Sequence, residues 1–261
     1  MDRHRSFLIV IPTFNERENL PRIVDRVLSA SSDADVLVID DCSPDGTADV
    51  ARDLARQSDR VLLIERPSKM GLGSAYLRGF KESLTNGYRG VCTMDADNSH
   101  DPNVLPAMFG LLNAADLVIG SRYVPGGDTN QGLARRANST IANFLARTVL
   151  DLPVKDCTSG YRLYSVDLLR KLDLTDLRSR GYSLLVELLC EVVESGGRVA
   201  EVPIEFRDRC AGVSKIGMHE IWESVRTIAR LRRGKFGNIR TRLANGLYRM
   251  LPLKNRMRET D

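Results

Sequence analysis

Short apolar runs alternate with segments of helical periodicity in the first half of the chain, and this alternation constrains the fold most. A continuous apolar run is typical of a strand buried on both faces, as in parallel sheets. Runs of this kind cover residues 7–11, 36–39, 61–64, 90–94 and 117–119, and a sixth candidate covers residues 199–204. Between the first two runs, residues 20–28 carry apolar side chains at helical spacing. Strands and helices in this order predict an α/β fold with a parallel sheet and right-handed crossovers.

The size and composition of the chain fit this fold class. A chain of 261 residues buries about three quarters of its unfolded surface, which supports a full core. No apolar run approaches the roughly 20 residues of a membrane-spanning helix, and the first residues lack the pattern of a secretory signal. Five scattered cysteines without a CxxC favour reduced thiols over disulfides. We therefore expect a cytoplasmic protein.

Positive charge is concentrated toward the C-terminus. Residues 224–261 hold 11 Lys and Arg against 2 Asp and Glu, although the formal net charge of the whole chain is only +4. Apolar residues at helical spacing with arginines between them are typical of helices that lie on a membrane surface. Nucleic acid is the other polyanion to consider, but no nucleic-acid-binding motif is present. We expect basic amphipathic membrane-surface helices over residues 218–261, although helices packed on the body would also explain the apolar stripe.

Charged and polar side chains follow directly after four of the predicted strands. Open α/β sheets bind their ligands at this edge, where the carboxyl ends of the strands meet. The residues are Asn15, Glu16, Asp40, Asp41, Asp95, Asp97 and Arg122. Asp40 and Asp41 would either cap the next helix or accept hydrogen bonds from a nucleoside. Four strand ends of this kind predict one binding site.

Asp95-Ala96-Asp97 is the strongest chemical signal. Carboxylates at positions i and i+2 of an extended segment point to the same side, so both can reach one cation. Mg²⁺ and Mn²⁺ prefer such oxygen ligands. The alternative is a capped turn before the helix start at Asp101-Pro102. Because Asp95 and Asp97 end a strand opposite Asp40 and Asp41, we favour metal binding over the capped turn.

Several segments suggest phosphate binding. Lys69-Met70-Gly71-Leu72-Gly73 fits a phosphate cradle at a helix N-terminus about as well as a plain tight turn. Guanidinium groups suit phosphate oxygens, and the candidates are Arg122, Arg135, Arg136 and Arg209, with Lys215 nearby. The GxSxG, GxGxxG and Walker motifs are absent, which argues against a serine hydrolase, a dehydrogenase and a P-loop NTPase.

Six segments in register resemble known enzymes. Residues 12–16, 40–47 and 95–100 have the order and spacing of family 2 glycosyltransferases, and residues 120–123, 158–164 and 212–215 narrow the resemblance to polyprenol (dolichol) phosphate mannose synthases. The resemblance implies a GT-A fold, Rossmann-like with a mostly parallel sheet flanked by helices, as a catalytic domain over residues 1–217. It also implies transfer of mannose from GDP-mannose to a polyprenyl monophosphate.

By position, the resemblance assigns roles to individual residues. The nucleotide-sugar residues would be Pro12, Phe14, Glu16, Asp40, Asp41, Lys69, Asp95, Ala96, Asp97, Arg209 and Lys215. The metal ligands would be Asp95, Asp97 and Ser99. The acceptor phosphate would contact Arg122, Arg135, Arg136 and Ser214. The catalytic residues would be Asp97, Arg122 and Arg135, and Thr140 departs from the Arg that relatives often carry there.

The implied chemistry agrees with the residue types. A phosphate monoester with a second pKa of about 6 is mostly a dianion at pH 7, so it needs positioning and charge neutralisation rather than a general base. A divalent metal would stabilise the GDP leaving group, and in-line attack would invert the anomeric carbon.

The acceptor lipid also implies a location. The basic tail would attach the enzyme to the cytoplasmic membrane face, at about 1 kcal/mol for each basic residue near anionic lipid, and a membrane-embedded partner protein could assist. UDP-glucose as donor and a catalytically inactive nucleotide sensor remain alternatives.

Overall fold

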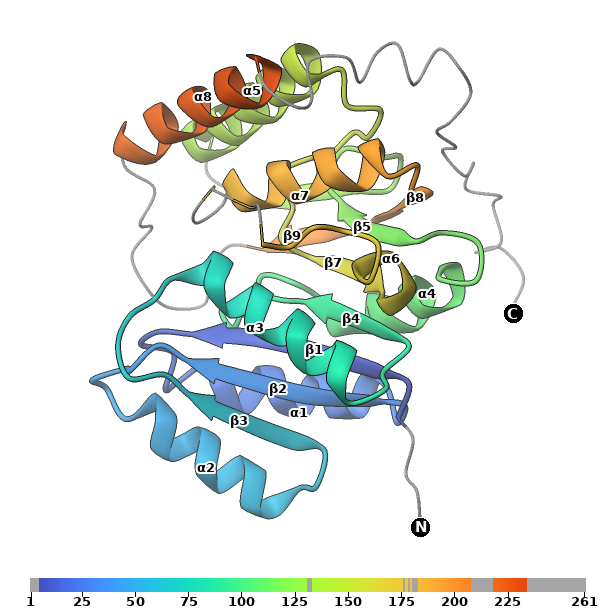
Figure 1. Cartoon of the computed structure of the whole chain (residues 1–261). Helices are drawn as coiled ribbons and strands as arrows, with labels where there is room; N and C mark the ends of the chain where they lie inside the picture. Colours follow the sequence, from blue (N-terminus) through green and yellow to red (C-terminus); the bar gives the residue numbers. More distant parts are fainter. Residues whose placement is uncertain are drawn as a thin grey trace.

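A seven-stranded sheet runs through the middle of the protein in the order β3-β2-β1-β4-β7-β5-β8 (Figure 1). The structure is a computed structural model that describes residues 5–130, 133–175, 177, 179, 183–207 and 218–233. The strands of this sheet are β1 (Phe7–Thr13), β2 (Ala34–Asp40), β3 (Val61–Glu65), β4 (Gly90–Thr93), β5 (Leu117–Ser121), β7 (Arg162–Ser165) and β8 (Val199–Pro203). Two short strands, β6 (Asp128–Asn130) and β9 (Glu205–Arg207), pair separately.

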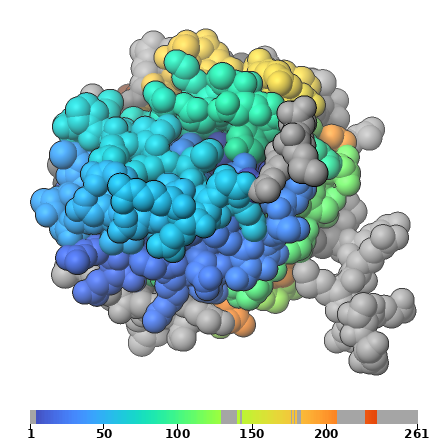
Figure 2. Space-filling model, turned by 90° about the horizontal axis from the view of Figure 1, so that it is seen from below, coloured from blue at the N-terminus to red at the C-terminus, as the bar shows by residue number. Residues whose placement is uncertain are grey.

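Helices cover both faces of the sheet, because alternate strand residues are buried on opposite sides. Val10 belongs to the core beneath α3 (Leu72–Thr85), α5 (Leu133–Leu150), α6 (Val166–Leu169), α7 (Ser183–Glu194) and α8 (Met218–Arg233). Ile9 belongs to the core beneath α1 (Leu20–Ala30), α2 (Thr47–Gln57), α4 (Leu105–Leu111) and the short 3₁₀ helix Pro102–Val104. Seen from below, the surface comes mainly from the N-terminal half of the chain (Figure 2). The three layers confirm the predicted α/β class.

One strand breaks the parallel pattern. β1, β2, β3 and β4 pair in parallel, as do β5 and β8, but β7 lies antiparallel between β4 and β5. β7 was not predicted from the sequence, because the strand begins with a charged residue. The guanidinium of Arg162 is fully buried and donates to the carbonyl oxygens of Ser159, Cys157 and Leu185. These hydrogen bonds compensate the burial of the Arg162 charge, which the sequence alone would suggest is exposed.

The C-terminal helix of the described part packs on the body. α8 contacts α5 and α7, and its Ile228 and Leu231 are buried (Figure 1). Arg230 pairs with Glu187 at 3.5 Å, and Arg232 pairs with Asp151 at 3.0 Å. The rest of the predicted basic tail, residues 234–261, lies outside the described residues. Within the described residues, no helix is long and apolar enough to cross a membrane.

Candidate active site at the carboxyl ends of the strands

Asp40 ties the ends of β1 and β2 together. Its Oδ1 accepts from the hydroxyls of Thr13 at 2.9 Å and Ser43 at 2.6 Å, and its Oδ2 accepts from the Ser43 N–H at 2.9 Å. The carboxylate is buried, so Asp40 shapes the loop after β2 from within. The N-cap of the helix that follows is Gly46, and Asp45 just before it accepts the N–H of Thr47 through Oδ1 at 3.0 Å.

Asp41 joins the loop after β2 to the turn before α3. Its Oδ2 accepts the N–H of Gly71 at 2.8 Å, and its carboxylate forms an ion pair with Arg66. Arg66 also donates to the Gly71 carbonyl at 3.1 Å. Gly71 has a φ of +88°, which favours glycine. Because the Gly71 N–H already serves Asp41, the geometry supports the tight-turn interpretation of residues 69–73 over a phosphate cradle.

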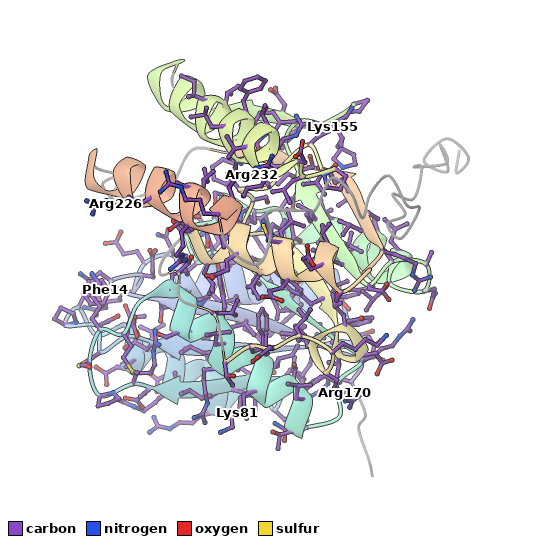
Figure 3. The ribbon with its side chains drawn as sticks, turned by 45° about the horizontal axis from the view of Figure 1, so that its top comes forward. Phe14, Lys81, Lys155, Arg170, Arg226 and Arg232 are labelled. Atoms are coloured by element: carbon purple, nitrogen blue, oxygen red, sulfur yellow. The ribbon has the colours of Figure 1, made fainter. Side chains whose placement is uncertain are left out.

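An aromatic ring and a cation meet at the same edge of the sheet. The Lys69 ammonium lies 3.8 Å from the centroid of the Phe14 ring, within the range of a cation–π interaction. Phe14 projects from the end of β1 (Figure 3). Glu16 is fixed in the same loop, since its N–H donates to Thr47 at 3.0 Å and its Oε2 accepts from Asn19 at 2.8 Å. Pro12, beside them, pairs in register with β2. The predicted nucleoside residues therefore gather on two neighbouring strand ends.

The acidic pair follows β4, next to β1 in the sheet. Oδ1 of Asp95 accepts from the Tyr76 hydroxyl at 3.3 Å, and Oδ1 of Asp97 accepts the N–H of Ser99 at 3.0 Å. The Ser99 hydroxyl is 1% exposed and makes no hydrogen bond within the described part of the chain. The same holds for the side-chain oxygen of the buried Asn98. Ala96, between the carboxylates, is buried.

These residues fit a hard divalent cation. No group of three His, Cys, Asp or Glu side chains that could hold a metal occurs among the described residues. The protein therefore offers two carboxylates and an unpartnered buried hydroxyl, a donor set of oxygens alone. Mg²⁺ and Mn²⁺ take such sets together with water and substrate phosphate oxygens.

Left-handed backbone marks this edge of the sheet. Among the described residues, positive φ values at positions other than glycine occur at Asn15 (61°), Cys42 (59°), Asn98 (62°) and Asp151 (51°). The first three lie in the loops after β1, β2 and β4, the strands that lead to the predicted site. Residues in this region cost about 1–3 kcal/mol each and cluster at functional sites.

His100 holds the backbone of the acidic pair by a hydrogen bond. Its Nδ1 accepts the N–H of Asp95 at 3.2 Å, and its ring stacks on Tyr161 at 4.9 Å and meets Phe206 edge-on at 5.6 Å. Burial lowers the pKa of His100, so the ring is neutral at pH 7. No role was predicted for this residue from the sequence, because the three histidines of the chain are far apart.

Arg122 follows β5 and is held by a carboxylate that the sequence analysis did not select. Its Nε and Nη2 donate to Asp156 at 2.8 and 2.9 Å, and Nη2 also donates to Thr158 at 2.8 Å. Burial alone would raise the pKa of Asp156, but the charge and hydrogen bonds of Arg122 outweigh it and hold that pKa below its ordinary value. The guanidinium lies 5.5 Å from the Phe206 ring, which also contacts His100. Phe206 thus links the arginine to the acidic pair.

The remaining predicted residues are only partly placed. Arg135 and Arg136 lie in the first turn of α5, but their side chains are outside the described part. Arg209, Ser214 and Lys215 lie outside the described residues.

Sequence comparison adds relatives to this geometry. Residues 8–173 match the profile described as glycosyl transferase family 2. A polyprenol monophosphomannose synthase from Mycolicibacterium smegmatis is 45% identical over 225 residues, which are 85% of each chain. An undecaprenyl-phosphate mannosyltransferase from Micrococcus luteus is 42% identical over 224 residues, 85% of this chain and 92% of the relative.

Solved structures share the fold at lower identity. A glucosyl-3-phosphoglycerate synthase from Mycobacterium tuberculosis, in complex with Mn²⁺, uridine diphosphate and phosphoglyceric acid, superposes with a TM-score of 0.63 at 20% identity and covers 88% of this chain and 78% of that one. TarS residues 1–349 from S. aureus, with UDP-GlcNAc, give a TM-score of 0.57 at 14% identity, covering 86% and 65% of the two chains.

Proposed function

Because the chain belongs to glycosyl transferase family 2 and has the GT-A fold, we propose that it transfers mannose from GDP-mannose to a polyprenyl monophosphate, with inversion at the anomeric carbon. One observation carries the proposal. The acidic pair Asp95 and Asp97 follows β4, and the fixed Arg122 follows β5, the strands on either side of β7. The Phe206 ring contacts both Arg122 and His100. Two relatives above 40% identity act on polyprenyl phosphates by their names.

The nucleotide would lie across the ends of β1 and β2. Phe14 and Lys69 offer an apolar ring and a positive charge, and Asp41 holds the turn that presents Lys69. Asp95, Asp97 and Ser99 would hold the divalent metal, Mg²⁺ or Mn²⁺. When bound, this ion supplies positive charge to the diphosphate of the leaving nucleotide.

The acceptor phosphate would be bound by Arg122, together with Arg135, Arg136 and Ser214. The phosphate dianion is itself the nucleophile, so the chain needs no general base. His100 agrees with this, since its ring is buried and its Nδ1 already accepts the N–H of Asp95. Attack in line with the departing diphosphate would give the β-mannosyl phosphate from the α-linked donor.

A lipid acceptor requires contact with a membrane, and two helices offer a surface for it. α5 exposes the large apolar side chains of Ile141, Phe144 and Leu145, to 57%, 62% and 41%. The spacing of these three residues places them on one helix face. α8 lies beside α5 and exposes Arg226 and Arg233. Arg226 lies halfway along α8, on the same side of the view as Phe14 (Figure 3).

We propose that this surface and the basic residues 234–261 attach the catalytic domain peripherally to the cytoplasmic face of a membrane. Apolar side chains beside arginines suit the interface of an anionic bilayer. Arg230 and Arg232 contribute less, because each pairs with an acidic residue of the body. A membrane-embedded partner protein would bind the same surface.

Transfer of radiolabelled mannose to solvent-extractable polyprenyl phosphate tests the proposal. We expect product from GDP-mannose, loss of product with EDTA and recovery with added Mg²⁺ or Mn²⁺. Product from UDP-glucose alone would mean that UDP-glucose, not GDP-mannose, is the donor. Product in the presence of EDTA would rule out a requirement for the metal. The absence of lipid product from either donor would overturn the function.

A further inference from the structure

Asp156 lies in the loop before β7 and receives both the side chain and the main chain of Arg122. Its Oδ2 accepts from Nε at 2.8 Å and from the Arg122 N–H at 3.1 Å, while its Oδ1 accepts from Nη2 at 2.9 Å. Oδ1 also accepts the Thr158 N–H and hydroxyl at 3.2 and 3.1 Å and the Ser159 N–H at 3.0 Å. A fully buried carboxylate with six donors has a single orientation, and it fixes the plane of the guanidinium.

The buried ion pair between Asp156 and Arg122 is not needed for stability alone. A buried ion pair offsets its desolvation cost only with good geometry, and apolar side chains often stabilise a core equally well. A bidentate carboxylate does, however, fix the direction of an arginine that must meet another anion. The arrangement therefore favours a positioning role for Asp156.

The loop that carries Asp156 is itself clamped from two sides. On β8, the buried Glu201 accepts the N–H of Lys155 at 2.8 Å and the N–H of Asp156 at 2.9 Å. On α5, Asn143 donates to the Lys155 carbonyl at 2.7 Å and accepts the N–H of Cys157 at 2.9 Å. Glu201 pairs in register with Ile119 of β5, the strand that ends at Arg122. The clamp thus connects one strand and one helix to the arginine.

α5 is also the helix with the exposed apolar face. Asn143 is buried on the inner side of the helix, between the outer residues Ile141 and Phe144. A displacement of α5 therefore changes the carbonyl and amide contacts that hold the Asp156 loop. We propose that Asp156 positions Arg122 for the acceptor phosphate, and that Asn143 makes this position depend on the placement of α5. The inference rests on the proposed function, because it takes the acceptor as a membrane lipid.

Asp116 offers a matched control at the opposite end of β5. It holds Arg198 with the same pattern of bonds, Oδ2 to the N–H and Nε and Oδ1 to Nη2, at 2.8, 3.0 and 3.0 Å. Asp116 precedes β5, so it lies at the edge of the sheet away from the site. Asp116→Asn therefore removes a similar ion pair without touching Arg122.

The experiment compares transfer to polyprenyl phosphate in vesicles with transfer to soluble farnesyl phosphate. For Asp156→Asn we expect a roughly 10- to 100-fold loss of kcat/KM for both acceptors, with GDP-mannose affinity unchanged. For Asn143→Ala we expect a loss that is several-fold larger for the vesicle acceptor. Asp116→Asn should leave kcat/KM unchanged for both acceptors. The inference would be overturned if Asp156→Asn weakened GDP-mannose binding as much as it lowered kcat/KM for the acceptors. It would also be overturned if Asn143→Ala lowered kcat/KM equally for both acceptors.

Two further arms keep the outcome decisive. If Asp156→Asn does not fold, Thr158→Val removes only the hydroxyl that joins Arg122 to Asp156, and the same acceptor-specific loss is expected on a smaller scale. If the wild type transfers no sugar, the proposed function fails. Calorimetric binding of farnesyl phosphate then tests the positioning role, which predicts weaker binding in Asp156→Asn than in Asp116→Asn. Equal binding would reject it.

Discussion

The N–H of Ser99 donates to Oδ1 of Asp97 at 3.0 Å, while the buried Ser99 hydroxyl makes no hydrogen bond within the described chain. A buried hydroxyl without a partner costs about 1–3 kcal/mol, so a ligand is expected to offset this cost. The turn holds the main chain of Ser99 against the Asp97 carboxylate. Both residues are therefore targets for tests of metal binding.

Asp97→Asn should lower metal-dependent mannose transfer by about 100-fold or more, because the neutral amide neither attracts the cation nor neutralises it. The measurement is the transfer rate across a titration of Mn²⁺ and Mg²⁺. Asp53→Asn is the control, since Asp53 pairs with Arg56 on the exposed surface of α2. Substantial turnover in Asp97→Asn would rule out the assigned metal role.

Ser99→Ala should raise the metal concentration needed for half-maximal rate by roughly 10-fold while leaving the melting temperature unchanged or higher. Removing the hydroxyl breaks no hydrogen bond to the described protein. Ser83→Ala is the matched control, because the buried Ser83 hydroxyl donates to the Phe80 carbonyl at 2.8 Å and lies in α3. That variant should lose some stability and keep its metal dependence. An unchanged metal requirement in Ser99→Ala would exclude the hydroxyl as a ligand.

The pairing of Lys69 with Phe14 predicts a defect confined to the donor. Phe14→Leu and Lys69→Met should each weaken GDP binding in calorimetry, and neither should change the KM for the lipid acceptor. The double variant should show a coupling of about 0.5–1 kcal/mol, the range of an exposed cation–π contact. Additive effects would mean that the two side chains do not act together on the nucleotide.

Asp116 predicts a pH-dependent stability. Burial would raise the pKa of Asp116, but hydrogen bonds from Arg198 outweigh it and hold the pKa below the ordinary value of 3.8. A lowered folded-state pKa stabilises the protein above the unfolded value, and this stabilisation is lost as the pH falls through the folded-state pKa. Because Arg198 is 43% exposed, the effect is about 1 kcal/mol.

In Asp116→Asn the melting temperature should therefore be about 2–4 °C lower at pH 7, and the difference should shrink below pH 4. Thermal unfolding from pH 3 to pH 8 measures it, with Asp53→Asn as an exposed control. A difference that stays constant with pH would assign the loss to packing instead.

Most strands that the sequence predicted are buried on both faces, such as residues 7–11, where every side chain is apolar, whereas the edge strand β3 is only partly buried. β7 was missed because its buried Arg162 is satisfied by carbonyl groups from a loop and from α7, which no local pattern reveals. Strand-end position selected Asp95, Asp97 and Arg122 as candidates, and the structure places them after β4 and β5. It could not distinguish the inward Asp40 from Asp41, since both follow the same strand.

Partners that are distant in sequence account for the rest of the site. Asp156 is separated from Arg122 by 34 residues, and its role depends on a hydrogen-bond pattern rather than on its neighbours in sequence. His100 follows β4 and Phe206 lies on β9, which pairs with β6, so their contact joins segments that are far apart in sequence. Such contacts follow from the topology.

The exposed face of α5 predicts membrane binding through specific side chains. Phe144→Ser should lower the bound fraction on phosphatidylglycerol vesicles by several-fold, because it removes a large apolar side chain that is 62% exposed. Leu62→Ser is the control, since Leu62 is 40% exposed on β3 at the other end of the sheet. Arg226→Gln should weaken binding more than Arg232→Gln, because Arg232 pairs with Asp151. Vesicle sedimentation measures all four variants, and equal binding by Phe144→Ser and Leu62→Ser would place the membrane contact elsewhere.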